Sequence, residues 1–408
     1  MFRIMSGLIA VLLLAAGLPG RGRALAPQEQ ITILVVIDGF RADYLERGLT
    51  PNLAVLGARG VRGSLLPVFP SVTFPNHFTL LTGKTAEEHG IIENDFEDPV
   101  LGAFGSANPP NVRDPRFWTG AKPIWVSAEE QGVGTAHYFW PTTGMDGAGN
   151  RPARFTRFDA SVKMENEPAE LLKWLDLPMA ERPRFLTLYF YHVDSIGHRD
   201  GPNSTALNEE LKKVDTAIGN LVTGLDKRGL LQRTNILVTA DHGMSEVAPD
   251  NRVFLDDLID PAKLHVIAAN ADALIAPAPG VALEEVAGKL AGKHERMTCW
   301  RKEDVPARLH FSKHPRISPI VCAAEPGWLI TTRARYKSPA APTGSHGYDP
   351  ETPDMAALFV AAGPSFAQGR TLPPISNLEL YPLLVKLLGI RGEATGHDGA
   401  PFAPALAP

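Results

Sequence analysis

The stretch ITILVVI, residues 31–37, decides the fold, because it is a continuous run of apolar and β-branched side chains. Such a run is typical of a central parallel strand that is buried on both faces of a sheet. Residues 185–191, 235–240 and 356–362 form similar runs, and residues 204–229 carry leucine, valine and isoleucine at helical spacing. Strands that alternate with helices predict an α/β fold, with a mostly parallel central sheet and helices on both faces.

The length and composition allow one large domain with an insertion. The chain has 408 residues, of which 44% are hydrophobic, so a substantial core can form. Residues 254–343 are richer in proline and hold both cysteines, and we expect them to form an inserted α+β subdomain. Residues 27–253 and 344–408 would then form the main domain. The polar, proline-rich residues 99–118 are expected to form a long surface loop.

Residues 1–26 have the anatomy of a secretory signal peptide. Arg3 precedes a short apolar stretch, and residues 24–26 resemble a small-residue cleavage site. The apolar stretch is too short for a comfortable membrane span, so we expect a periplasmic or secreted protein with no stable membrane insertion after cleavage. Pro27 disfavours a cut directly after Ala26, which leaves another cleavage site or an uncleaved anchor as the alternatives.

The cysteines and the charge narrow the choice of partners. Cys299 and Cys322 are the two cysteines of the chain, and in an exported protein such a pair is expected to form a disulfide. The formal net charge is −5 and no basic block occurs, which argues against a nucleic-acid binding surface. We therefore expect a small-molecule substrate.

Side chains that bind metals recur in four separated segments of the chain. Asp38, Asp194 and Asp241 each follow an apolar run by a few residues, and the carboxyl ends of parallel strands meet at one edge of a sheet. Three imidazoles and one hydroxyl complete the set that two zinc ions need if each keeps a position open for substrate. The candidate ligands are Asp38, Thr73, Asp194, His198, Asp241, His242 and His346. The alternative for each aspartate is a cap for the helix that follows it.

Thr73 is a candidate nucleophile because of its place before a predicted helix. Pro75 favours a helix start, so Thr73 would lie at or beside the helix N-terminus, where backbone N–H groups stabilise negative charge. Alone, a threonine there would be an N-cap. Opposite two metal ions it becomes a nucleophile, because coordination lowers the pKa of its hydroxyl. Asn94 could donate its amide to a phosphoryl oxygen, and its alternative role is that of a turn residue.

Seven segments, in this order, resemble the nucleotide pyrophosphatase/phosphodiesterase family of the alkaline phosphatase superfamily. They are VVIDGFRADYL, FPSVTFPNHFTLLTGKTAEEHGIIEN, PIWVSAEEQGV, YFWP, VDSIGHRDGP, VTADHGM and GSHGYDP. The resemblance implies an alkaline phosphatase-like catalytic domain that binds two Zn²⁺ ions, and it matches the predicted insertion poorly. It assigns one zinc to Asp194, His198 and His346, and the other to Asp38, Asp241, His242 and Thr73.

The same resemblance implies the substrate contacts. Asn94 matches a residue that contacts a non-bridging phosphoryl oxygen, and Phe74 matches an aromatic wall of the substrate pocket. Phe158 falls near the second aromatic side chain that completes a slot for the base in nucleotide-cleaving members. Aromatic faces on both sides of a planar base would favour nucleotides through stacking. Plain core packing is the alternative for each phenylalanine.

The expected function is zinc-dependent hydrolysis of phosphodiester or phosphoanhydride bonds in nucleotides or similar diesters, through a phosphothreonyl intermediate on Thr73. A phosphate monoesterase and a lipid or choline-headgroup phosphodiesterase of the same superfamily are the alternatives. A sulfatase is disfavoured because the chain has no Cys-x-Pro-x-Arg motif. A non-catalytic zinc-binding protein would have lost a ligand or the nucleophile, and none is missing.

Overall fold

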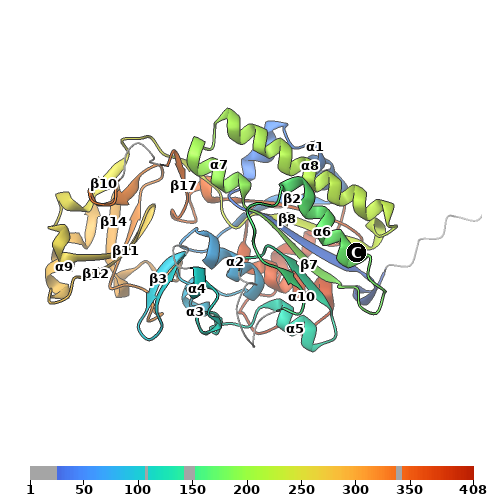
Figure 1. The fold of residues 1–408 in the computed structure, drawn as a ribbon, viewed down its shortest axis with the longest axis horizontal. Coiled ribbons are helices and arrows are strands. Elements are labelled where there is room, and N and C mark those ends of the chain that lie inside the picture. The colour runs from blue at the N-terminus through green and yellow to red at the C-terminus, as the bar shows by residue number, and fades with distance from the viewer. Residues whose placement is uncertain (1–24, 106–108, 142–151, 337–341) are drawn as a thin grey trace, which may run out of the picture.

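The computed structural model describes residues 25–105, 109–141, 152–336 and 342–408. Its main body is built on a nine-stranded sheet in the order β19-β2-β18-β8-β1-β7-β5-β6, with β20 paired to β2 (Figure 1). The strands are β1 (Ile31–Ile37), β2 (Val61–Leu66), β5 (Thr135–Tyr138), β6 (Phe155–Thr156), β7 (Phe185–Phe190), β8 (Thr234–Thr239), β18 (Ala357–Ala362), β19 (Arg370–Thr371) and β20 (Ile375–Ser376).

The strand β1 lies inside this sheet, between β7 and β8, and pairs in parallel with both. Every residue of β1 is buried, as its continuous apolar run predicts. The strand β5 is parallel to β6 and β7, whereas β18 runs antiparallel to β2 and β8. The predicted α/β fold with a mostly parallel central sheet is confirmed.

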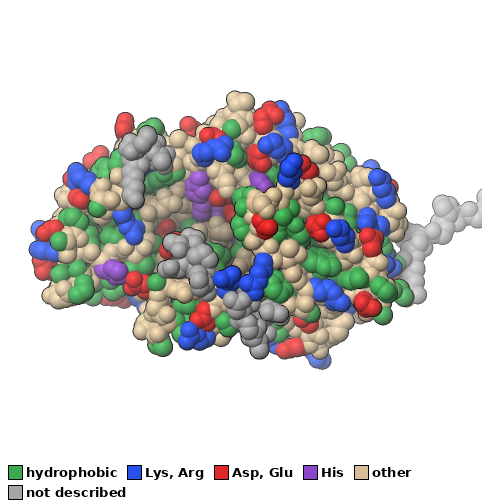
Figure 2. All heavy atoms as spheres, viewed as in Figure 1, with side chains coloured by type: hydrophobic (Ala, Val, Ile, Leu, Met, Phe, Trp, Pro, Cys, Tyr) green, Lys and Arg blue, Asp and Glu red, His purple; other side chains and the backbone are tan. Residues whose placement is uncertain are grey.

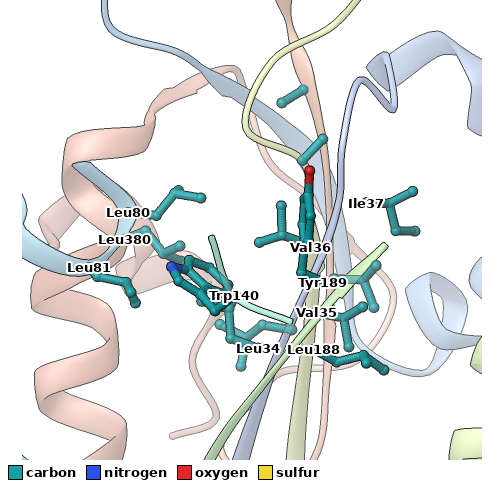
Figure 3. Close-up of a cluster of buried hydrophobic side chains, with 14 of the residues drawn as sticks. Leu34, Val35, Val36, Ile37, Leu80, Leu81, Trp140, Leu188, Tyr189 and Leu380 are labelled. Carbon is teal, nitrogen blue, oxygen red and sulfur yellow. The ribbon is translucent and has the colours of Figure 1, made fainter. Parts of the chain in front are cut away.

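Helices cover both faces of the sheet (Figure 1). One face carries α1 (Pro51–Arg59), α6 (Glu167–Leu175), α7 (His192–Asp200) and α8 (Thr205–Lys227), and the other carries α2 (Thr73–Thr82), α3 (Ala86–His89), α5 (Ile124–Glu130) and α10 (Leu380–Leu388). Figure 3 shows apolar side chains of β1 near Leu80 and Leu81 of α2 and Leu380 of α10. This buried packing fixes α2 against the sheet, and with it the position of Thr73 at the start of the helix.

A second, smaller body lies at the left of Figure 1, where a five-stranded antiparallel sheet has the order β11-β12-β15-β14-β13. Its elements are β11 (Leu264–Ala269), β12 (Asp272–Pro277), α9 (Leu283–Leu290), β13 (Gly292–His294), β14 (Met297–Arg301) and β15 (Ile320–Ala324). They fall within residues 254–343, and the exact bounds of that insertion stay a prediction. Cys299 and Cys322 face each other on β14 and β15 and are bonded, which confirms the disulfide.

The described residues also contain short two-stranded sheets and one short α-helix. They are β3 (Asp95–Asp98) with β4 (Gly102–Gly105), β9 (Ser245–Glu246) with β17 (Gly344–Ser345), β10 (Arg252–Phe254) with β16 (Leu329–Thr331), and α4 (Pro109–Val112). The described part of residues 99–118 is not a plain surface loop, so that expectation was wrong. Phe104, Phe117 and Trp118 are buried and pack on one another, because burial of three large rings outweighs the polar character of their neighbours.

The predicted signal peptide lies almost entirely outside the described residues, which begin at residue 25. Within the described part of the chain, none of the helices has the length and apolar character that crossing a membrane requires.

Candidate active site

The candidate carboxylates lie where three adjacent strands end. Asp38 directly follows β1, Asp241 follows β8 after one residue, and Asp194 lies in the first turn of α7, just after β7. Since β1 pairs in parallel register with both β7 and β8, the three strand ends meet at one edge of the sheet. Asp38 and Asp241 are buried, with 3% and 1% of their surface exposed. The capping alternative does not account for the aspartates, because the helices after β1 and β7 have Arg41 and Tyr191 as N-caps, and β8 is followed by a strand.

The three candidate histidines turn their Nε2 atoms into the same space. Each Nδ1 donates to a backbone carbonyl oxygen, at 2.8 Å for His198 and at 2.9 Å for His242 and His346. This hydrogen bond makes Nε2 the ring nitrogen that faces a ligand, as in histidines that bind metals. The rings of His242 and His346 stack with their centroids 3.6 Å apart. Figure 2 shows histidine side chains in a hollow between the smaller sheet and the main body.

The distances between these side chains fit a shared cation. Asp194 Oδ1 lies 3.3 Å from His198 Nε2 and 3.4 Å from His346 Nε2. His242 Nε2 lies 3.3 Å from both Asp38 Oδ1 and Asp241 Oδ2. These separations exceed the roughly 2.7–2.9 Å of a charge-assisted hydrogen bond. Ligands at zinc–nitrogen and zinc–oxygen distances of about 2.0–2.1 Å lie roughly 3.3 Å apart in a tetrahedron, so the spacing and the donor types both fit divalent metals.

The charges of the site are poorly balanced without a cation. Burial, followed by repulsion from Asp241 and Asp194, raises the pKa of Asp38 well above its usual value. Burial also acts to raise the pKa of Asp194, but His198, His346 and His242 together lower it to about 2. Burial lowers the pKa of His346 to about 3, which keeps its imidazole neutral and able to bind a metal. A bound cation would relieve the repulsion among the three carboxylates.

Thr73 is the first residue of α2, and the N-cap position is held by Val72. The N-cap alternative for Thr73 is therefore wrong. Its Oγ1 lies 3.3 Å from His242 Nε2 and so faces the group of Asp38, Asp241 and His242. The structure brings the candidate nucleophile to the candidate ligands, at the positive end of a ten-residue helix.

Asn94 is held by the start of the same helix. Its Oδ1 accepts a hydrogen bond from the backbone N–H of Phe74 at 2.8 Å. Because the oxygen is used in this way, the amide nitrogen is the part of the side chain that is left to donate to a ligand. The backbone N–H of Asn94 donates in turn to Glu93 Oε1 at 2.8 Å. Asn94 is thus tied to the helix that carries Thr73 and is not an isolated turn residue.

A cavity of about 500 Å³ adjoins Thr73. Phe74 and Phe158 line it, together with Val112, Arg113, Phe139, Trp140, Pro141, Arg157 and Tyr189. Phe158 is 50% exposed and packs edge-on against Phe139 and Tyr191, so the core-packing alternative is wrong for this residue. Phe74 is partly buried against Phe104 and Trp118 and keeps contact with the cavity. The size is in the range of sites for drug-sized ligands, about 300–1,000 Å³.

Two residues at the site were not singled out from the sequence. His77 is fully buried, and its Nε2 lies 3.4 Å from Asp241 Oδ2. The Tyr189 hydroxyl donates a short hydrogen bond to Asp38 Oδ2. The helical period could have found His77, because residues four apart share one face of a helix and Thr73 precedes it by four. For Tyr189, one hydroxyl in an apolar strand gives no such signal.

The fold and the site together define a class of protein. A sheet gathers carboxylates, imidazoles and a helix-terminal threonine at its carboxyl edge, beside a cavity with aromatic walls, as expected of a metal-dependent phosphoryl hydrolase. The family model described as type I phosphodiesterase / nucleotide pyrophosphatase matches residues 32–349, and the chain belongs to this family. It is therefore a phosphoric diester hydrolase of the nucleotide pyrophosphatase/phosphodiesterase class.

Individual relatives agree with this assignment. The chain is 37% identical to an uncharacterized pyrophosphatase/phosphodiesterase of Schizosaccharomyces pombe, over 91% of this chain and 80% of that protein. It is 34% identical to human ectonucleotide pyrophosphatase/phosphodiesterase family member 5, over 92% of this chain and 78% of that one. The structure of murine ectonucleotide pyrophosphatase/phosphodiesterase 5, an inactive threonine-to-alanine variant in complex with AMP, superposes with a TM-score of 0.87. That match has 31% identity and covers 93% of this chain and all of the murine chain.

Proposed function

We propose that the chain hydrolyses nucleotide phosphodiester or phosphoanhydride bonds with two zinc ions and a covalent phosphothreonyl intermediate on Thr73. One observation carries the proposal: the hydroxyl of Thr73 lies at the start of α2, 3.3 Å from His242 Nε2 and beside an aromatic cavity. A hydroxyl needs activation to attack phosphorus, and the ligand set around it can supply that activation.

We assign the ligands to two sets, and His242 lies within reach of both, since it also groups with Asp194 and His346. Asp194, His198 and His346 would hold one zinc, since both imidazoles face Asp194 Oδ1. The second zinc would be held by Asp38, Asp241, His242 and Thr73, because His242 Nε2 faces the other three. Bound zinc would lower the pKa of the Thr73 hydroxyl and offset negative charge on the phosphoryl oxygens.

In the first step, Thr73 Oγ1 gives its proton to water and forms a bond to phosphorus while the bond to the leaving oxygen breaks. Asn94 donates its amide nitrogen to a non-bridging oxygen, where negative charge grows in the transition state. Its oxygen stays bonded to the N–H of Phe74, which keeps the donor aimed toward the start of α2. The leaving alcohol or phosphate departs with a proton from water.

In the second step, water attacks the phosphorus of the phosphothreonine and the bond to Thr73 Oγ1 breaks. Thr73 recovers its proton and the phosphomonoester is released. A nucleoside triphosphate would thus give a nucleoside monophosphate and pyrophosphate. Asp38, Asp194 and Asp241 keep their places through both steps, since the strands β1, β7 and β8 that end beside them are buried.

The cavity beside Thr73 supports a nucleotide over a choline headgroup. Phe74 and Phe158 offer aromatic faces to a planar base. Arg113 and Arg157 also line the cavity, and none of its described lining residues is acidic. Two guanidinium groups repel a quaternary ammonium ion, whereas they suit the acceptor edges and phosphates of a nucleotide. The bound AMP of the murine relative agrees with this preference.

The proposal is tested with three chromogenic substrates: the nitrophenyl diester of thymidine 5′-monophosphate, nitrophenyl phosphate and nitrophenyl phosphorylcholine. We expect the nucleotide diester to have the highest kcat/KM, by at least about 10-fold over the other two, because the pocket contacts distinguish them in the transition state. A monoester that is the best substrate by a wide margin would contradict the diesterase assignment, and the choline ester as best substrate would contradict the nucleotide assignment.

Phe158 provides a separate prediction about the base. Phe158→Ala should lower kcat/KM for the thymidine diester by about 3- to 10-fold, because one stacking face is lost. The half-exposed ring contributes little to the core, so the melting temperature should stay close to the wild-type value. Bis(4-nitrophenyl) phosphate has no base and serves as the control. An equal loss on both substrates would show that Phe158 does not bind the base.

Export of the protein is also proposed. The N-terminal residues 1–26 support a periplasmic or secreted location, and the bonded Cys299–Cys322 pair is typical of oxidising compartments.

A further inference from the structure

The segment of residues 87–98, here called the Asn94 segment, is bound along its length by the smaller sheet and the loop that follows β14. We propose that Asp272 and Arg316 are positioning residues, which hold the Asn94 segment so that Asn94 meets the phosphoryl group. This inference rests on the proposed role of Asn94 and gives the residues 254–343 a direct part in catalysis.

Arg316 binds the Asn94 segment on both sides of Asn94. Its Nε lies 2.6 Å from Asp98 Oδ2, and one terminal nitrogen donates to the carbonyl oxygen of Gly90 at 2.6 Å. The same nitrogen donates to the carbonyl oxygen of Phe117 at 2.9 Å. Only 8% of the side chain is exposed, so these charge-assisted hydrogen bonds are shielded from water. One planar guanidinium thereby fixes the backbone before and after Asn94.

Asp272 holds the residue next to Asn94. Asp272, at the start of β12, lines one cavity together with Glu93, and Asp272 Oδ2 and Glu93 Oε2 are both buried and accept from no N–H or hydroxyl group. Two such groups can hydrogen-bond only if they share a proton. Glu93 Oε1 in turn accepts the backbone N–H of Asn94 at 2.8 Å. With that proton, a chain of hydrogen bonds runs from the smaller sheet through Glu93 and Asn94 to Phe74, the residue after the nucleophile.

The other attachments of the segment differ in burial. His265 of β11 contacts Glu97 at 2.9 Å, but both side chains are nearly half exposed. Exposed ion pairs contribute about 0–1 kcal/mol, so this contact should matter little. The contact between His265 and Glu97 belongs to the same interface as Arg316, so a variant of His265 serves as the control for variants of Arg316.

Arg316 also packs on the aromatic cluster that supports the substrate pocket. Its guanidinium carbon lies 5.3 Å from the ring centroids of both Phe96 and Phe117. Phe96 stacks on Phe104, which contacts Phe74. Loss of Arg316 can therefore act on substrate binding through Phe74 and on the chemical step through Asn94. The two routes separate in the kinetics, because the first raises KM and the second lowers kcat.

A double-mutant cycle tests the inference. Arg316→Met and Asp272→Ala are each made in the wild type and in Asn94→Ala, and kcat is measured with the thymidine diester. Asn94→Ala should lower kcat by about 10²- to 10³-fold. Arg316→Met and Asp272→Ala should each lower kcat by about 10-fold in the wild type, because small displacements of a catalytic donor are costly. In the Asn94→Ala background each should change kcat by less than about 2-fold.

Two control variants keep the inference testable if Arg316→Met folds poorly. Arg316→Lys retains the charge near Asp98 but cannot reach both carbonyl oxygens, so an intermediate kcat is expected. His265→Ala should leave kcat within about 2-fold of wild type. Equal losses from Arg316→Met and Asp272→Ala with and without Asn94 would overturn this inference and leave the proposed role of Asn94 standing. An unchanged kcat in Asn94→Ala would overturn the proposed role of Asn94 together with the inference.

Discussion

Thr73→Ala is expected to lower kcat by about 10⁴-fold or more, because removal of a covalent nucleophile costs about as much as removal of the whole catalytic set. The variant keeps the other six candidate ligands, and Val72 rather than Thr73 caps α2, so the helix should stay in place. Metal content and melting temperature should therefore remain near the wild-type values while turnover is lost. Both are measured on the sample used for kinetics with the thymidine diester.

Thr73→Ser is the matched variant, because it keeps a hydroxyl on the same backbone. It should retain measurable turnover, and acid quenching during turnover should trap a phosphoryl group on residue 73. Near-wild-type turnover by Thr73→Ala with intact metal content would remove Thr73 from the mechanism. A protein that had lost its metal would point to a ligand role alone.

Removal of the metal ions is expected to lower turnover to the background rate of the assay. Three carboxylates lie near the nucleophile, two of them buried, and the pKa of Asp38 is raised by burial and by Asp241 and Asp194. Without cations, this site would repel an anionic phosphodiester and could not activate Thr73. Dialysis against a chelator followed by the diester assay measures the effect.

Adding metals back tests the identity of the ion. Imidazole and carboxylate ligands suit Zn²⁺ and other transition metals, whereas Mg²⁺ prefers oxygen ligands and retains its waters. Zn²⁺ should therefore restore activity and Mg²⁺ should not. Full activity after exhaustive chelation would contradict a metal-dependent reaction, and restoration by Mg²⁺ alone would contradict the assignment of zinc.

The sequence predicts those parts of the fold and site that depend on local patterns. The apolar run of β1 has the same bounds in the structure, 31–37, because a strand buried on both faces shows no alternation. Asp38, Asp194 and Asp241 come together because they follow parallel neighbours of one sheet. Thr73 was placed at a helix start because Pro75 marks the first turn of α2.

Other parts depend on contacts between distant segments and could not be predicted. The sequence of β18 does not reveal that the strand runs antiparallel to β8, because it is apolar throughout. Buried rings in residues 99–118 are hidden among polar neighbours, and Tyr189 meets Asp38 only after β1 and β7 pair. The contact of Arg316 with Asp98 joins positions 218 residues apart. Side chains of this kind acquire their role from tertiary packing alone.

In the proposed mechanism, seven side chains form one site for two zinc ions beside the nucleophile. The most direct measurement is the metal content of the purified protein, by mass spectrometry of the elements after dialysis against metal-free buffer. Two zinc ions per chain are predicted for the wild type, and fewer for Asp194→Ala and Asp241→Ala, one in each set of ligands. Wild-type protein that is fully active with no more than trace metal would contradict the account.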